Sequence, residues 1–257
     1  MNDRTDLTFK KADLHMHTPE SDCYSDKSVS LEQIVDAALA AGLEVIAITD
    51  HNTFAAINGI RKIAEKKGLT VLPGVELTTK CGHIIALFDN DSSLERLEEF
   101  LDYIGVNQEG RGNGTANIGD DIEEVLQKID ERGGIAIAAH IERWPSGFLE
   151  TSESRQVKMG IHASQYLSAL EITVPQNKQL WNTGQVRDYP KKYACVQGSD
   201  AHALKDISRR PVYIQMDGVS LEALRLAFLD YKTNIIFPDE LLLIEQKAAV
   251  SKTDESS

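Results

Sequence analysis

The stretch ADLHMHTPESD, residues 12–22, decides how the rest of the sequence is interpreted. It has the pattern of a short strand that ends in a loop, and alternate side chains of a strand share one face. Asp13, His15 and His17 are therefore expected to point the same way, and Asp22 follows in the loop. Two imidazoles on one strand face, followed by a carboxylate, indicate side chains that share a cation.

Strand-like and helix-like segments alternate along the whole chain. The apolar runs predict strands at 11–18, 44–51, 69–79, 83–89, 134–140, 168–174, 193–202 and 211–216. The helical periodicity predicts helices at 30–42, 54–68, 94–104, 120–132 and 221–230, with Ser30 as the first N-cap. Fully apolar strands separated by amphipathic helices predict a parallel sheet covered by helices, and this many units favour a closed α/β barrel.

The predicted barrel occupies residues 1–238 as one domain, and a C-terminal helix and disordered tail follow at 239–257. The glycine-rich segment 105–119 is expected to be a flexible loop, either a lid or a plain connector. The loop 142–156 leaves the strand that ends at His140, so it is expected to border any site at that strand end.

Chemistry-bearing residues gather at the predicted strand ends, where α/β barrels place their active sites. They are His15, His17, His51, Glu76, His140, Asp200 and His202. A single strand histidine is more often a hydrogen-bonded core residue than a ligand, but convergence on one barrel mouth indicates metal. Imidazoles and carboxylates together suit zinc, manganese or iron, and this set exceeds the needs of one ion. Glu76 is the natural bridge between ions, and multi-metal sites of this kind hydrolyse phosphoesters.

The net charge of −13 weighs against broad binding to a nucleic-acid backbone, although metal ions would make one pocket locally positive. The three cysteines, Cys23, Cys81 and Cys195, are far apart and form no CxxC pair, which argues against a disulfide framework. No apolar run approaches membrane-spanning length and the N-terminus has no hydrophobic signal core. A cytoplasmic location without membrane association is therefore expected.

The order of the motifs DLHMHT with SD, ITDH, PGVE, a histidine on the next strand, AAH and GSDAH resembles the PHP (polymerase and histidinol phosphatase) family. The resemblance covers about residues 10 to 216. It implies a distorted, seven-stranded (β/α) TIM-like barrel, a trinuclear metal centre and hydrolysis of phosphoesters by a metal-bound hydroxide. The implied cofactors are three divalent ions, Mn²⁺, Zn²⁺ or Fe²⁺.

Carried over residue by residue, the resemblance implies three sets of ligands. The first ion would be held by His15, His17, Glu76 and Asp200, the second by Glu76, His83 and His140, and the third by Asp22, His51 and His202. The implied catalytic residues are His15, His17, Glu76, Asp200 and His202, and His202 or His51 is an alternative proton-transfer group if the third metal site is empty.

Two positions depart from the family pattern. Cys23 stands where glycine commonly follows the aspartate of SD, and Ile141 replaces the usual proline after the AAH histidine. A loop thiol without a role is favoured over a thiolate ligand at Cys23. The change at Ile141 is expected to alter the path of the loop without touching the ligand.

Three arginines are candidates for binding a substrate phosphate, because a planar guanidinium can bind two oxygens at once. They are Arg143 on the His140 loop, and Arg209 and Arg210 beyond the His202 strand end. Trp144 has two interpretations, a stacking platform for a nucleobase and a cap on the barrel rim, and the cap is favoured.

The leading hypothesis for function is a phosphoesterase that acts on nucleotides or short oligonucleotide ends. The segment GSDAH…ISRR also resembles PHP domains joined to ATPase modules, which implies a possible ATPase partner. The alternatives are a small-molecule phosphatase of the histidinol-phosphate type, an amidohydrolase, and a non-catalytic PHP module that binds a phosphorylated ligand or a partner.

Overall fold

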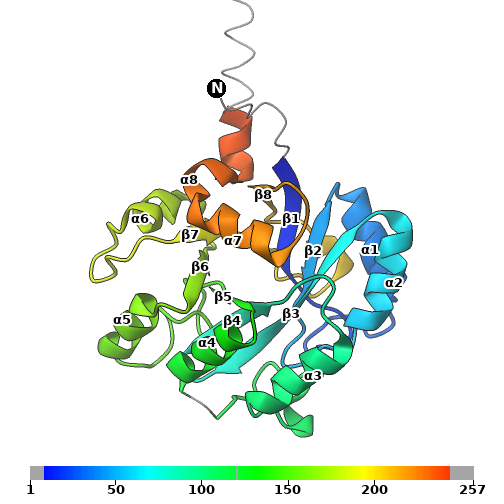
Figure 1. Ribbon diagram of the computed structural model, residues 1–257, viewed down its shortest axis with the longest axis horizontal. Helices are drawn as coiled ribbons and strands as arrows, with labels where there is room; N and C mark the ends of the chain where they lie inside the picture. Colours follow the sequence, from blue (N-terminus) through cyan, green and yellow to red (C-terminus); the bar gives the residue numbers. More distant parts are fainter. Residues whose placement is uncertain (1–8, 120, 244–257) are drawn as a thin grey trace, which may run out of the picture.

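The computed structural model describes residues 9–119 and 121–243 (Figure 1). These residues contain a nine-stranded sheet in the order β7-β6-β5-β4-β3-β2-β1-β8-β9. The strands are β1 (Phe9–Met16), β2 (Val45–Ile48), β3 (Thr70–Thr79), β4 (Gly82–Leu87), β5 (Ile135–Ala138), β6 (Leu167–Glu171), β7 (Ala194–Val196), β8 (Val212–Gln215) and β9 (Ile235–Ile236). A strand lies in each of the eight regions predicted from the apolar runs, but β7 covers only Ala194–Val196 of the predicted 193–202, and the residues that follow form the loop that carries Asp200 and His202.

The sheet curls into a nearly closed barrel of β1 to β7. The segment after β7 returns to β1, where the backbone N–H of His17 donates to Ala201 O at 3.1 Å and that of Asp200 donates to His15 O at 2.8 Å. The strands β1, β2 and β3 run parallel, as do β5, β6 and β7, and β4 is antiparallel to both of its neighbours. The distorted seven-stranded (β/α) barrel is thus confirmed.

The last two strands lie outside this ring. β8 pairs antiparallel with the first half of β1, from Phe9 to Ala12, and β9 pairs antiparallel with β8. The predicted strand at 211–216 therefore extends the sheet and is not a further parallel barrel strand.

Helices lie around the outside of the sheet (Figure 1). They are α1 (Leu31–Ala40), α2 (Ile57–Lys67), α3 (Leu94–Tyr103), α4 (Ile122–Glu131), α5 (Arg155–Ala163), α6 (Lys178–Thr183), α7 (Leu221–Leu229) and α8 (Tyr231–Asn234). Ser30 caps α1 in a reciprocal capping box with Gln33, as its sequence position predicts. The helices α5 and α6 were not predicted; α6 is short and polar, and α5 buries only Ile161 and His162.

α7 fixes which end of the barrel is available for a site. The guanidinium of Arg225 donates to the carbonyls of Gly133 and Gly134, at 3.0 and 2.6 Å, directly before β5 begins. Leu224 and Phe228 of α7 are buried. α7 therefore covers the amino ends of the parallel strands, and the carboxyl ends are left to build the site.

The predicted C-terminal segment is described only in part. Residues 238–243 are helical, and the rest of the predicted helix and tail lies outside the described residues. Within the described part of the chain, no helix has the length and apolar character that crossing a bilayer requires.

Candidate metal centre

The strand ends bring the predicted ligands together at the carboxyl mouth of the barrel. His15 and His17 come from the end of β1, His51 follows β2, His140 follows β5, and Asp200 and His202 follow β7. His83 lies at the start of β4. Because β4 runs antiparallel to its neighbours, its start lies beside their carboxyl ends, at the same mouth of the barrel.

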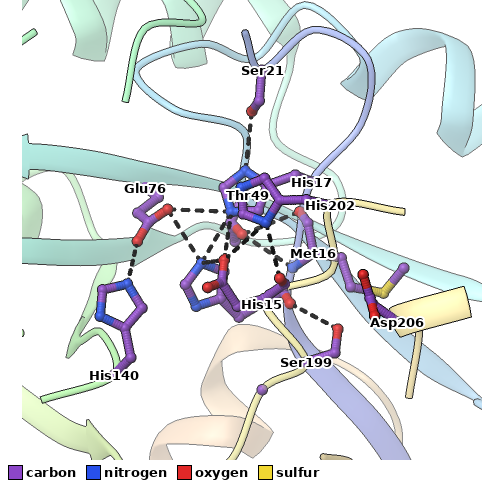
Figure 2. A network of polar contacts seen from close by, with 12 residues as sticks. His15, Met16, His17, Ser21, Thr49, Glu76, His140, Ser199, His202 and Asp206 are labelled. Atoms are coloured by element: carbon purple, nitrogen blue, oxygen red, sulfur yellow. Dashed lines mark hydrogen bonds and ion pairs between the residues drawn. The ribbon is translucent and has the colours of Figure 1, made fainter. Parts of the chain in front are cut away.

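Glu76 of β3 is fully buried and lies at the centre of the cluster (Figure 2). Its Oε1 atom is 2.8 Å from His83 Nδ1 and 2.9 Å from His140 Nε2. Its Oε2 atom lies 3.3, 3.2 and 3.1 Å from ring nitrogens of three more histidines, His15, His17 and His51. One carboxylate thus joins both sides of the site, as a bridging ligand would.

Neighbouring acceptors fix which ring nitrogens of His15 and His17 carry hydrogen. His15 Nδ1 donates to Glu171 Oε2 at 2.8 Å. His17 Nδ1 lies 3.0 Å from the hydroxyl of Ser21, whose own hydrogen is donated to Asp50 Oδ1 at 2.7 Å. Both Nδ1 atoms are therefore protonated, and both Nε2 atoms present lone pairs to the cavity.

With both imidazoles neutral, this arrangement brings lone pairs together, whereas a second proton on either ring would be shared with the carboxylates. The Nε2 atoms of His15 and His17 are 3.2 Å apart, and Asp200 Oδ1 lies 3.3 and 3.1 Å from them. Glu76 Oε2 is buried and has no hydrogen-bond partner. Buried acceptors that face one another are costly unless a cation lies between them, so this donor set fits a divalent metal.

Three groups of potential ligands have donor atoms within 4.8 Å of one another among the described residues. They are His15, His17, Glu76 and Asp200; His51, Glu76 and His83; and His17, His51 and His202. His140 joins the second group through its contact with Glu76 Oε1. Asp22 is exposed and lines the cavity but belongs to none of these groups.

The electrostatics of the cluster are dominated by its carboxylates. Burial opposes ionisation of Glu76 and Asp200, but neighbouring histidines, His15 foremost, outweigh it and hold the pKa of both carboxyls well below their usual value. Burial alone would lower the pKa of His17, yet Asp200 and Glu76 raise it to about 9. At His51 burial prevails and lowers the pKa to about 3. Negative charge therefore persists in a buried pocket, which favours a cation there.

Backbone conformation at the mouth is strained at three positions. Asn52, His140 and Asp200 have φ values of 52°, 28° and 49°, in the left-handed region that side chains other than glycine rarely occupy. Asn52 directly follows the predicted ligand His51, and His140 and Asp200 are themselves predicted ligands. Such strain is tolerated where the surrounding structure fixes a side chain for function.

The cluster opens into a cavity of about 440 Å³. Asn113, Gly114 and Thr115 of the glycine-rich segment form part of its wall, so this segment lies against the site. Asn52 holds it there, because its side-chain amide donates to the carbonyls of Asn113 and Ala116 at 3.1 and 3.0 Å. The flexibility expected of residues 105–119 stays a prediction, but residues 113–115 lie beside the predicted metal ligands.

The three candidate arginines have different surroundings. Arg143 lines the cavity and pairs with the carboxylate of Asp200. Arg209 donates through Nε to Ser199 O at 2.6 Å, and Arg210 donates through Nε to Gly198 O at 3.0 Å. Only Arg143 of the three lies in the cavity wall, whereas Arg209 and Arg210 brace the loop that carries Asp200.

Three residues that orient the candidate ligands were missed from the sequence, namely Ser21, Asp50 and Glu171, and Asp13 was named there only for the strand face that it shares with His15 and His17. Glu171 accepts from His15 Nδ1 and also from the backbone N–H of His140, at 3.0 Å. Asp13 accepts from the N–H groups of Ser199 and Ser208, at 2.9 and 3.0 Å. The available signal was a lone carboxylate inside an apolar strand, as at Glu171 in SALEITV.

Two further residues near the cavity were weighed from the sequence. Partial burial raises the pKa of Cys23 to about 11, so its thiol is neutral at physiological pH, in keeping with a loop thiol without a role. Trp144 is 75 % exposed. The favoured interpretation of Trp144 as a cap on the barrel rim is therefore wrong, because a cap would bury the indole.

Comparison with known proteins places this geometry in a family. The model of the PHP domain matches residues 13–157. A protein of Methanocaldococcus jannaschii without assigned function is 33 % identical over 137 residues, which cover 51 % of this chain and 67 % of that protein. A 5′-3′ exoribonuclease of Haemophilus influenzae is 37 % identical over 70 residues, or 27 % of this chain and 24 % of that enzyme.

Among solved structures, the lesion-specific endonuclease Q of Pyrococcus furiosus superimposes with a TM-score of 0.65 at 17 % sequence identity. The match covers 86 % of this chain and 56 % of the endonuclease, so this chain corresponds to little more than half of that enzyme. At this identity the likeness supports the fold. The family model, the barrel and the cluster at its mouth agree: the chain belongs to the PHP family, a family of metal-dependent phosphoester hydrolases.

Proposed function

We propose that this protein hydrolyses phosphoester bonds of nucleotides or short oligonucleotide ends at a trinuclear metal centre. The observation that carries the proposal is the convergence of buried ligand atoms: the Nε2 atoms of His15 and His17 lie 3.2 Å apart, and each lies within 3.3 Å of both Glu76 Oε2 and Asp200 Oδ1. Imidazole nitrogens and carboxylate oxygens at this spacing are a ligand set that suits divalent cations.

The positions proposed for the three ions are derived from the contacts that the two carboxylate oxygens of Glu76 make. The first ion would bind among His15, His17, Asp200 and Glu76 Oε2; the second on the side of Oε1, beside His83 and His140; the third beside His51 and His202, with Asp22 at the cavity edge. When bound, the ions supply activation of water and neutralisation of charge on phosphoryl oxygens.

The protein's own groups bind and orient the phosphate. Arg143 reaches the cavity on a side chain that is about one third exposed, so its guanidinium is available to a phosphoryl oxygen as well as to Asp200. His202 is held by its Nδ1 atom 3.0 Å from Asp200 O, which leaves Nε2 as a ligand for the third ion or, where that ion is absent, as the group that exchanges a proton at the cavity. Glu171 and Asp50 keep the two β1 imidazoles in the tautomer that offers Nε2.

Two observations support a nucleotide substrate: an exoribonuclease is among the relatives, and the volume of the cavity is sufficient for a nucleoside monophosphate. The test is manganese-loaded protein incubated with end-labelled short RNA and DNA, nucleotides, nucleoside bisphosphates and histidinol phosphate. Asp200→Ala is the inactive blank, and Asp217→Ala, an exposed carboxylate after β8, is the matched control.

Release of mononucleotides or of phosphate from nucleotides, lost in Asp200→Ala and kept in Asp217→Ala, is the expected result. Turnover of histidinol phosphate alone would replace the nucleotide assignment with a metabolic phosphatase. Amide hydrolysis or ring deamination would make the protein an amidohydrolase, and inertness on every substrate would favour the non-catalytic module.

A further inference from the structure

A second cavity, of about 730 Å³, adjoins the metal centre. The two cavities share the wall residues His83, Thr115 and Ser146, so a ligand at the metals can extend into the second one. We call this second cavity the side groove. Its wall also includes Lys80, Trp144, Glu150 and Glu153.

Trp144 is the large apolar side chain of the side groove, and it is 75 % exposed. Among the residues that the structure describes, no other aromatic ring packs on the Trp144 indole. A tryptophan left in water forgoes the free energy that its burial would contribute. An exposed indole beside a site is therefore a surface on which a flat ligand can stack.

The turn that carries Trp144 is held on both sides. The backbone N–H of Arg143 donates to His140 O at 2.8 Å, and that of Gly147 donates to Arg143 O at 2.7 Å. The backbone N–H of His83 donates to Ser146 O at 2.9 Å, which ties the turn to the start of β4. Because the backbone is fixed, a ligand that stacks on the indole does not have to order the turn.

Gly147 shows how tightly this turn is packed. A Cβ atom at Gly147 would lie 2.4 Å from His140 O and 2.5 Å from Ile141 O. The tight turn brings a predicted metal ligand, His140, a phosphate-binding candidate, Arg143, and an exposed indole, Trp144, onto one short segment. Trp144 thus lies one residue from a wall residue of the metal cavity, Arg143, and in the wall of the cavity that adjoins it.

The charges of the side groove indicate which part of a substrate it takes. Lys80 is its one cation among the wall residues, and the carboxylates of Glu150 and Glu153 oppose it. A groove that followed a nucleic-acid backbone would carry an excess of lysine and arginine. This groove is instead suited to a neutral, flat group with hydrogen-bonding edges, which describes a nucleobase.

We infer that the side groove binds the nucleobase next to the scissile phosphate, with Trp144 as its stacking platform. The inference rests on the proposed function and deepens it, because it makes a base part of the substrate and excludes simple sugar phosphates as good substrates. Stacking is tolerant of base identity, so the same groove accepts purines and pyrimidines with modest preference.

The test compares wild-type protein with Trp144→Ala, Trp144→Phe and a control, Leu229→Ala, which removes an equally exposed apolar side chain from α7. The substrates are a short oligoadenylate and the same oligomer with an abasic sugar at each position in turn. On the oligoadenylate, Trp144→Ala is expected to raise KM about tenfold with little change in kcat, as loss of one base stack implies. Trp144→Phe is expected to retain most of the affinity, and Leu229→Ala all of it. With the abasic sugar at one particular position, wild type and Trp144→Ala are expected to have equal KM values.

Binding provides a readout that does not need catalysis. Adenosine monophosphate is expected to quench the emission of Trp144 in wild-type protein, and the quenching disappears in Trp144→Phe, which keeps the buried Trp181 as an internal reference. Quenching without hydrolysis supports the base subsite while the proposed function falls. Hydrolysis with unchanged KM in Trp144→Ala, or absence of quenching, overturns the subsite and leaves the proposed function standing.

Discussion

At the scale of single residues, the carboxylate of Glu171 determines how two of the candidate ligands are held. Its Oε2 atom accepts from His15 Nδ1 and from the backbone N–H of His140. Glu171→Gln preserves the shape of the side chain but removes the negative charge that favours a donating Nδ1–H on His15. Metal affinity is expected to fall about 10- to 100-fold, measured by calorimetric titration with Mn²⁺.

Glu142→Gln is the matched control for this prediction. The carboxylate of Glu142 accepts from the N–H groups of Thr173 and Val174, at 3.1 and 2.9 Å, on the loop after β6, and touches none of the histidines. Its replacement is expected to leave metal affinity unchanged. Equal losses in both variants would mean that Glu171 acts only through the stability of the fold.

At the scale of elements, the glycine-rich segment acts as a wall of the site. Gly112 N–H donates to His51 O at 2.9 Å, and a Cβ atom at Gly114 would lie 2.6 Å from His51 Nε2. Gly114→Ala is therefore expected to displace the His51 ring. We expect kcat to fall about a hundredfold, because even a shift of about 1 Å in a group at the reacting centre is costly.

Gly119 provides the control on the same segment, because a Cβ atom there meets no atom within 4 Å. Gly119→Ala is expected to keep wild-type turnover of the best substrate found for the protein. If Gly114→Ala also turned over at the wild-type rate, the segment would be distant from His51 in the working enzyme.

At the scale of the whole molecule, His162 makes the stability of the fold depend on pH. Its ring is buried on α5 among Trp181, Tyr189 and Tyr193, with centroid distances of 5.7, 5.1 and 5.1 Å. Burial, aided by the charge of Lys191, lowers its pKa from 6.5 to about 4. Between pH 6.5 and about pH 4, the unfolded chain therefore carries a proton on His162 that the folded chain does not. The stability that comes from a neutral, buried His162 is lost as pH falls below 6.5.

His162→Phe keeps an aromatic ring in this position and removes the titrating group. The free energy of unfolding of wild type, relative to that of His162→Phe, is expected to fall by about 1 kcal/mol between pH 7.5 and pH 5.5. Urea denaturation of both metal-loaded proteins at the two pH values measures this difference. Parallel pH profiles would show that the folded protein admits a proton to His162.

Features that depend on local sequence patterns could be predicted, and features that depend on contacts across the barrel could not. The barrel strands and most helices follow from local patterns of period 2 and 3.6, and the histidines at strand ends identified the mouth because parallel strands end on one side. Glu171 and Asp50 escaped notice because their roles depend on which strand ends meet across the barrel. The exposure of Trp144 depends on the path of a tight turn, which periodicity does not encode. A cytoplasmic location and an ATPase partner stay predictions.

The central claim is that Glu76 bridges several divalent ions at the barrel mouth, and metal content measures this directly. Protein purified in Mn²⁺ and exchanged into metal-free buffer is analysed by inductively coupled plasma mass spectrometry, beside Glu76→Gln. The wild-type chain is expected to retain three ions, and Glu76→Gln at most one, because each Glu76 oxygen contacts a different group of histidines. One ion or none in wild type, or equal metal content in both proteins, would contradict the account.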